Sequence, residues 1–161
     1  MRGEPPAGGA PASNIARWDG LAWAALGAGT TEAVLALAVY DGKLFAGGRF
    51  SSAGGLGTPR LAVWDRSAWH AQGEGVGGAI RALTGYGNEL VAGGMFSGAG
   101  GGRTNCIARW DGARWRELGS GMAGGELRTC VSALGVYGGE LIAGGDFEFA
   151  GEALVRSIAR G

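Results

Sequence analysis

The chain has 161 residues, enough for one domain, and equal numbers of basic and acidic residues (14 each) give a net charge of zero. A neutral chain has no general electrostatic attraction to nucleic acid or to an anionic membrane surface. Glycine is unusually frequent at 36 residues, but hydrophobic residues make up 46%, so burial can offset the entropy cost of ordering the glycines. The longest strongly apolar run, residues 33–40, is too short to span a bilayer, so no membrane insertion is expected.

Residues 1–13 are rich in Gly, Pro and Ala, and we expect them to form a loop or tail ahead of a domain at 14–161. Ala7-Gly8-Gly9 matches glycine pairs that precede later segments, so the sequence begins inside the loop of a repeat. Residues 1–11 lack an apolar stretch, which predicts no secretory signal in this sequence. A signal that was removed, or that lies on a longer parent chain, stays open.

The first structured segment is expected to be a hairpin that carries two tryptophans. Ile15-Ala16-Arg17-Trp18-Asp19-Gly20 is followed by Trp23, and alternating apolar residues around an Asp-Gly break are typical of two strands joined by a tight turn. The segment returns at a step of 46 residues with Trp64 and Trp69, and again with Trp110 and Trp115. We expect the tryptophans to pack between repeats. The aspartates after the first tryptophans are expected to cap local N–H groups of the turns: Asp19, Asp65 and Asp111.

A second hairpin follows each tryptophan segment. Residues 33–40 are almost continuously apolar, which predicts a strand buried on both faces, and Asp41-Gly42 predicts a turn into a second strand at 43–48. The copies place the inner strands at 79–86 and 130–137, and the second strands at 89–94 and 140–145. Each second strand ends in a glycine pair, where close backbone approach or positive φ is expected: Gly47 and Gly48, Gly93 and Gly94, Gly144 and Gly145.

Each unit is therefore four short antiparallel strands in about 46 residues, without helical periodicity, which is the size of one β-propeller blade. The units span 14–59, 60–105 and 106–156, and 157–161 begins a further one. The predicted fold class is all-β, with three blades of a propeller that is incomplete or completed by oligomerisation. Three arrangements stay open: part of a longer propeller, a homodimer with six blades, and a closed three-blade monomer.

A glycine pair that closes an inner strand, followed by a long loop and a tryptophan hairpin, resembles the kelch repeat and the galactose-oxidase-like propellers. The fuller phrase, Ala-Gly-Gly-x-Phe and then Ile-Ala-Arg-Trp-Asp-Gly, is similar to bacterial delta-60-type repeats and to the propeller of fungal bud-site cortical marker proteins. The resemblance covers nearly all of residues 7–160. It implies tight turns on one face and the long loops 49–60, 95–105 and 146–157 on the other, and it favours an extracellular or cell-surface location.

No catalytic or metal-binding set is apparent in the sequence. His70 is the only histidine, which excludes a multi-histidine metal site and the copper chemistry of galactose oxidase, and we expect it on the surface of an outer strand. No phosphate-binding glycine motif occurs, so we predict no cofactor, no metal and no enzymatic activity. Cys106 and Cys130 begin strands in neighbouring units, and both a disulfide and two separate thiols stay open.

Function is expected where the copies differ, on the long-loop face. The candidate residues for binding a partner are Arg49, Arg60, Arg103, Glu126, Arg128 and Phe149. The first hypothesis is a non-catalytic interaction module that binds a protein through this face. The alternative is a carbohydrate-binding propeller with one weak site per blade, in which the repeated tryptophans stack on sugars. A fragment of a secreted propeller enzyme is a third hypothesis.

Overall fold

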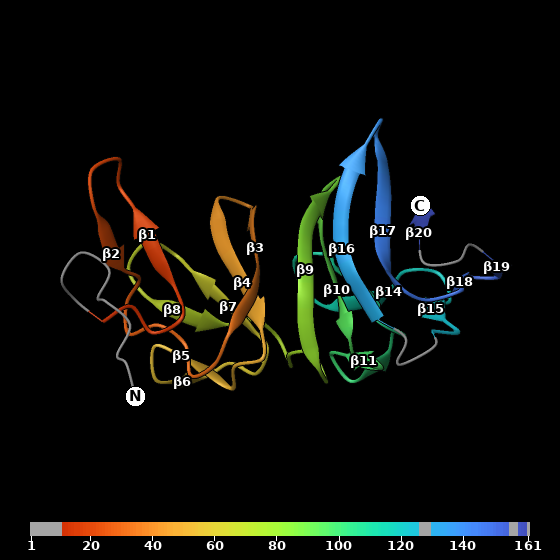
Figure 1. The fold of residues 1–161 in the computed structure, drawn as a ribbon. Coiled ribbons are helices and arrows are strands. Elements are labelled where there is room, and N and C mark those ends of the chain that lie inside the picture. Colours follow the sequence, from red (N-terminus) through yellow and green to blue (C-terminus); the bar gives the residue numbers. More distant parts are fainter. Residues whose placement is uncertain (1–10, 126–129, 155–157, 161) are drawn as a thin grey trace.

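The structure is a computed structural model that describes residues 11–125, 130–154 and 158–160. Within these ranges the chain contains strands, turns and loops and no helix. The predicted all-β fold class is therefore confirmed, as expected from a pattern without a 3.6-residue period. The sheets stand side by side in a row that runs from the N-terminal hairpin to the C-terminal strand (Figure 1).

The first four-stranded sheet has the strand order β3-β4-β7-β8 and is preceded by a separate hairpin of two strands. Its strands are β3 (Val34–Tyr40), β4 (Lys43–Gly48), β7 (Leu61–Trp64) and β8 (Trp69–Ala71). The hairpin consists of β1 (Ala16–Trp18) and β2 (Trp23–Ala25). This hairpin has the sequence of an outer pair, β7 and β8, but no inner pair of strands is hydrogen-bonded to it within the described residues.

The second sheet repeats the same order, β9-β10-β13-β14, and the third sheet has three strands in the order β16-β17-β20. The second sheet contains β9 (Ala79–Tyr86), β10 (Glu89–Met95), β13 (Ile107–Trp110) and β14 (Trp115–Glu117). The third contains β16 (Cys130–Tyr137), β17 (Glu140–Asp146) and β20 (Ile158–Arg160). The expected inner and second strands thus agree with the observed bounds to within one residue at each end.

The register of the second and third strands is the same in all three sheets. The alanine that begins the Ala-Gly-Gly phrase pairs with the alanine of the Ile/Leu-Ala segment. These pairs are Ala46 with Ala62, Ala92 with Ala108, and Ala143 with Ala159. Because a slip of one residue would reverse every side chain, this shared register puts equivalent residues on equivalent faces.

Each long loop folds into a short hairpin that the sequence pattern did not indicate. These hairpins are β5 (Ser52–Ala53) with β6 (Leu56–Gly57), β11 (Gly98–Ala99) with β12 (Gly102–Arg103), and β18 (Phe149–Ala150) with β19 (Ala153–Leu154). The link before each sheet pairs with its hairpin: Thr30 bridges Ala53, Val76 bridges Ala99, and β15 (Met122–Ala123) pairs with β18. In the first hairpin, Gly54 and Gly55 both have positive φ (58° and 82°), as a two-residue hairpin turn requires.

The hydrophobic core forms layers between consecutive elements of the row. Phe45 of the first sheet packs with Ile80 of the second, and Val91 of the second packs with Val131 of the third. A further layer lies between the N-terminal hairpin and the first sheet. The phenylalanine that ends each Ala-Gly-Gly-x-Phe phrase is buried beneath the loops: Phe50, Phe96 and Phe147.

Both glycines of the first pair are required by close approach. A Cβ on Gly47 would lie 2.5 Å from Cγ2 of Ile80 on the neighbouring sheet, closer than real Cβ atoms come. A Cβ on Gly48 would collide with the carbonyl oxygen of Ala33, at a point where the pairing of β3 with β4 shifts register. The first glycine therefore permits sheet-to-sheet packing, and the second permits the bulge in its own sheet.

The expectation that residues 33–40 are buried on both faces is wrong. Ala36, Ala38 and Tyr40 pack against the second sheet, but Leu37 on the opposite face is 52% exposed. Its counterpart in the second sheet, Leu83, is only 8% exposed, because the first sheet covers it.

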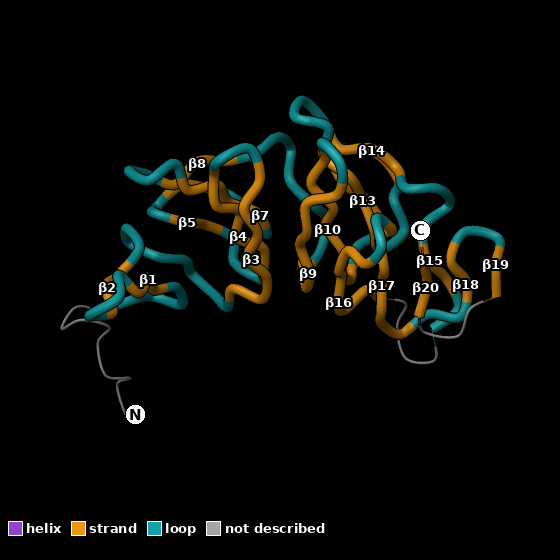
Figure 2. Tube along the Cα trace, turned by 90° about the horizontal axis from the view of Figure 1, so that it is seen from above, coloured by secondary structure: helices purple, strands orange, loops and turns teal. Residues whose placement is uncertain are grey.

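The two ends of the row lie far apart and no sheet closes (Figures 1 and 2), so the chain does not form the closed three-blade arrangement.

Candidate partner-binding surface

The repeated tryptophans form cross-strand pairs that are largely part of the core. In each hairpin the two tryptophans are directly opposite one another in the strand register, and their tilted rings have centroids 5.5, 5.3 and 5.6 Å apart in chain order. Trp69, Trp110 and Trp115 are buried, and the indole N–H of Trp69 donates to the carbonyl oxygen of Leu26 at 3.0 Å. These rings hold the outer strands together and pack them against the preceding link.

The aspartates of the tryptophan hairpins organise their turns, as expected. Oδ1 of Asp65 accepts hydrogen bonds from the backbone N–H groups of Ser67 and Ala68, both at 2.9 Å. These hydrogen bonds, followed by those from the Ser67 hydroxyl and from His70, hold the pKa of the Asp65 carboxyl well below its usual range. His70 is exposed on β8, with Nε2 2.6 Å from Oδ2 of Asp65.

Asp19 and Asp111 cap their turns in the same way. Asp19 accepts from the N–H groups of Leu21 and Ala22, which lower its carboxyl pKa. Asp111 accepts first from Arg116, at the position of His70, and then from two backbone N–H groups, and its pKa is also lowered. In all three hairpins the carboxylate is therefore engaged by its own turn.

Cys106 and Cys130 are both buried, and no disulfide joins them. Burial raises the pKa of the Cys106 thiol, and proximity to Cys130 raises it further, although the backbone N–H hydrogen bond with Phe96 partly opposes this. The pair therefore belongs to the packing between the second and third sheets rather than to an exposed reactive site.

The candidate loop residues are spread over three hairpins. Arg49 is exposed, and the guanidinium of Arg60 donates to the carbonyl oxygen of Arg49 at 2.9 Å, so these two lie together at the first hairpin. Arg103 is exposed on β12, and Phe149 is 39% exposed on β18. Glu126 and Arg128 lie outside the described residues.

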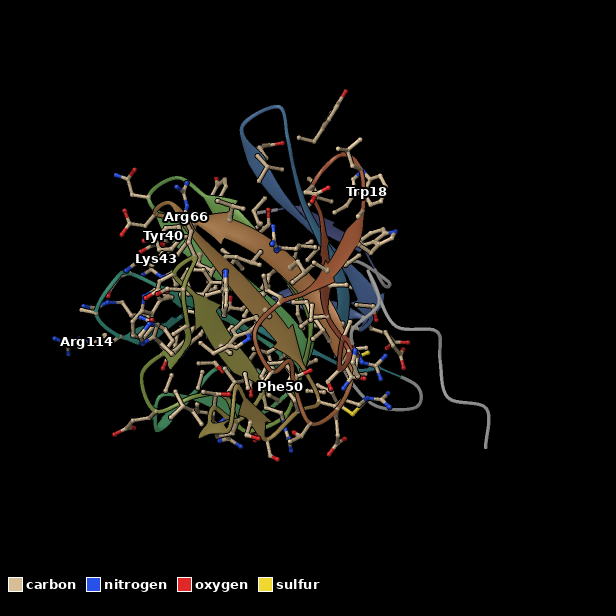
Figure 3. All side chains as sticks on the ribbon, turned by 90° about the vertical axis from the view of Figure 1, so that its left-hand side faces the viewer. Trp18, Tyr40, Lys43, Phe50, Arg66 and Arg114 are labelled. Carbon is tan, nitrogen blue, oxygen red and sulfur yellow. The ribbon has the colours of Figure 1, made fainter. Side chains whose placement is uncertain are left out.

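The tight turns and the long loops lie at opposite ends of the sheets. Figure 3 shows Tyr40, Lys43 and Arg66 gathered near the tight turns, well away from Phe50 at the start of the first long loop. This separation follows from antiparallel pairing, in which successive connections alternate between the two ends of a sheet.

A groove of about 900 Å³ lies beside the second short hairpin, between β12 and the outer strands β13 and β14. Arg103, Arg109 and Arg116 line it, together with Thr104, Asn105 and Trp115. Only Arg103 among these six was expected from the sequence to belong to a binding surface. The others were missed because they belong to strands or turns that recur in each repeat, and the contact of β12 with β14 that shapes the groove is not visible in the sequence pattern.

The three arginines of the groove differ in how their charge is used. Arg109 donates to both carboxylate oxygens of Glu89, at 3.1 and 3.2 Å, and to the carbonyl oxygen of Glu117. Arg116 pairs with Asp111. Arg103 is exposed and forms no ion pair within the part of the chain that the structure describes. Arg103 is therefore the cation of this groove whose charge is available to a ligand.

Two buried polar atoms at the groove have no hydrogen-bond partner among the described residues: Oγ1 of Thr104 and Nε1 of Trp115. Thr58, the counterpart of Thr104 in the first repeat, shares this feature, so it belongs to the repeat. Trp115 differs from its counterpart Trp69, which donates to a carbonyl oxygen. Buried polar groups are normally satisfied, so an unpartnered donor beside a groove is consistent with a ligand site.

Neither the protein-family models nor the curated protein sequences contain a match to this chain. The described residues contain no cluster of three or more His, Cys, Asp or Glu side chains with the geometry of a metal site. No helix long and apolar enough to cross a membrane occurs in these ranges. The resemblance to kelch-type repeats therefore stays a prediction.

Proposed function

We propose that the chain is a non-catalytic β-propeller module that binds a protein partner through its long-loop face. The groove beside β12, with the exposed Arg103 at its margin, is the observation that carries the proposal. It is formed by residues from the short hairpin and from the outer strands, so a rigid scaffold supports it.

The propeller architecture is supported by three features. Two sheets share one four-stranded order, the third sheet repeats its first three positions, and all three use the same register. Consecutive sheets pack face to face through glycine and branched aliphatic residues. Radial stacking of four-stranded sheets is how propellers are built.

The chemistry of the groove favours an acidic segment of a partner protein. Arg103 can form a charge-assisted hydrogen bond with a carboxylate of such a segment. Arg109 and Arg116 already pair with carboxylates of this chain, so the groove has one available cation rather than a broad basic surface. A single available arginine suits a side-chain carboxylate better than a polyanion such as nucleic acid.

A carbohydrate site in every blade receives less support. Sugar stacking requires an exposed ring face, but Trp69, Trp110 and Trp115 are buried in the core. Only the N-terminal hairpin keeps both of its rings, Trp18 and Trp23, substantially exposed. A glycan array on the purified chain separates the two functions, since clear sugar binding that is lost in Trp23→Ala would favour the alternative.

The proposal can be tested with phage-displayed peptides selected on the purified 161-residue chain. We expect acidic peptides to be enriched, and Arg103→Ala to weaken binding of a selected, fluorescently labelled peptide by about 10- to 150-fold, as expected for loss of one hydrogen bond to a charged group. Lys43→Ala is the matched control, because Lys43 is an exposed cation at the tight-turn end. Binding that is lost in Lys43→Ala but unchanged in Arg103→Ala would assign the function to the opposite face.

A further inference from the structure

The two ends of the row of sheets expose surfaces that match one another. The term N-terminal flank refers here to the uncovered face of the first sheet and its hairpin, which includes Trp18, Val34 and Leu37. The term C-terminal flank refers to the uncovered face of the third sheet and the link before it, at the other end of the row, which includes Gly119, Tyr137 and Gly144. Inside the chain, the counterparts of these residues contact one another at both sheet-to-sheet interfaces.

The inner strands provide the first match. Ile80 and Leu83 of the second sheet fill the space above Gly47 of the first, and Val131 and Leu134 of the third fill the space above Gly93. At the C-terminal flank, the equivalent Gly144 has no described atom within 4 Å of an added Cβ. At the N-terminal flank, the equivalent side chains are Val34, which is half-buried, and Leu37, which is half-exposed.

The outer strands provide the second match. The indole of Trp64 packs over Gly27, with Cζ3 2.9 Å from the position of an added Cβ, and Trp110 packs over Gly73 at 3.0 Å. Gly119 is the next glycine at this step of 46 residues, and nothing described lies above it. Trp18 is the equivalent tryptophan one repeat before Trp64, and no glycine among the described residues lies beneath it in the same way. Its side chain is 52% exposed, whereas that of Trp110 is 4% exposed.

A tyrosine hydrogen bond provides the third match. The hydroxyl of Tyr40 donates to the carbonyl oxygen of Asn88 in the next sheet at 2.7 Å, and that of Tyr86 donates to the carbonyl oxygen of Gly139 at 3.3 Å. Tyr137 holds the same position in the third sheet and is 81% exposed. The carbonyl group equivalent to those of Asn88 and Gly139 belongs to Gly42, on the N-terminal flank.

The third sheet also has a strand position that two segments of the chain can fill. β20 pairs with β17 there, and its sequence Ile158-Ala159-Arg160 is identical to Ile15-Ala16-Arg17 of the N-terminal hairpin. In the first and second sheets this position belongs to an outer strand with a tryptophan partner beside it. β20 has no such fourth strand within the described residues, whereas β1 has one in β2.

We propose that the C-terminal flank binds the N-terminal flank of a second copy of this chain, with β1 and β2 of that copy replacing β20 beside β17. This arrangement places Leu37 over Gly144, Trp18 over Gly119, and the Tyr137 hydroxyl on the carbonyl oxygen of Gly42. The inference rests on the proposed propeller architecture. The described strands of one copy fill positions in three blades, and those of two copies fill positions in six, within the range of about four to eight in propellers. Two copies related by a two-fold axis therefore close the ring.

Light scattering on the purified chain over a range of concentrations tests this assembly. We expect the wild-type chain to have the mass of two copies. Leu37→Asp and Gly144→Val should each raise the dissociation constant about a hundredfold, as changes at an interface centre do. Both variants should keep the circular dichroism spectrum of the wild type, because Leu37 is half-exposed and the space beside Gly144 is open. Ala113→Asp is the control, since Ala113 is exposed at the equivalent turn of the second sheet, outside both flanks, and should not affect the mass.

Mixing the two variants distinguishes head-to-tail from head-to-head contact. In a mixture, the intact N-terminal flank of Gly144→Val meets the intact C-terminal flank of Leu37→Asp, so heterodimers should form at concentrations at which each variant alone is monomeric. A head-to-head dimer would be disrupted by only one of the two substitutions and would overturn the proposal. Likewise, a wild-type chain that stays monomeric at all concentrations overturns it.

Two further variants examine the details of the contact. Tyr137→Phe should weaken the dimer by about tenfold through loss of one hydrogen bond. A chain that ends at Leu154 lacks the competing β20 and should dimerise more tightly than the wild type, and weaker dimerisation of this shortened chain would overturn the strand replacement. None of these measurements uses the peptide ligand, so a failure here leaves the peptide-binding test of the proposed function unaffected.

Discussion

Replacing Gly47 by alanine should destabilise the chain through a collision between two sheets. The added Cβ would lie 2.5 Å from Cγ2 and 3.0 Å from Cβ of Ile80, and 3.2 Å from Cδ1 of Leu83. The Ile80 atoms belong to a branched, fully buried side chain that cannot rotate away. Overpacking of this kind costs about 1–3 kcal/mol of the free energy of unfolding.

Gly144→Ala is the matched comparison, because Gly144 is the same residue of the phrase on an equivalent strand, and the space beside it is open. Alanine also reduces the conformational entropy of the unfolded chain, which stabilises by about 0.4–1 kcal/mol when the native backbone permits it. This effect is common to both substitutions and cancels in the comparison. Gly47→Ala should therefore be about 1–3 kcal/mol less stable than Gly144→Ala.

Urea unfolding followed by tryptophan fluorescence measures this difference. Both substitutions are made in the Leu37→Asp background, so that self-association through Gly144 does not contribute. For a chain of this size the difference corresponds to roughly 2–4 °C in Tm for each kcal/mol. Equal stability of the two variants would refute the argument that close sheet packing, rather than strand conformation, requires glycine at the first position of the pair.

Three other results are expected. Phe50→Ala should reduce the free energy of unfolding by about 3–5 kcal/mol in the same urea assay, whereas Phe149→Ala, at a partly exposed position, should cost much less. Because the folded pKa values of Asp65 and Asp111 lie below the unfolded value of about 3.9, their contribution to stability is present above about pH 4 and is lost as the pH falls through the folded values. Carbon-detected NMR titration should show that both carboxylates titrate below the usual range of an aspartate. The thiol of Cys106 should react with iodoacetamide at pH 8 only after unfolding in urea, since it is buried with a raised pKa, and rapid alkylation of the folded chain would contradict this.

Local features of the structure could be predicted from the sequence because short-range physics determines them. The tight turn at Asp41-Gly42 depends on residues that accept positive φ, which both adopt, and it sets the bounds of β3 and β4. The aspartate of each tryptophan hairpin needs only N–H groups two and three residues away, so its role was also predictable. The recurrence of the pattern then extended each local prediction to the other copies.

The short hairpins of the long loops were not predicted, since each contains only two residues per strand and has no hydrophobic alternation to reveal it. Their pairing depends on a bridge from a distant link, such as Thr30 with Ala53. The groove beside Arg103 was missed for a related reason. It depends on how β12 lies against β14, and this contact is not visible in the local sequence pattern.

The sequence by itself determined the all-β class, the bounds of the inner and second strands and the chemistry of the turns, because these depend on contacts between neighbours along the chain. Only the tertiary structure decided which face of each strand is buried. Leu37 and Leu83 occupy equivalent positions in two consecutive repeats, yet the first is exposed and the second is covered. The difference comes from the sheet that stands beside each of them, and burial of apolar surface depends on this neighbour rather than on the residue. The same reason explains why identical glycines are crowded at positions 47 and 93 and open at 144.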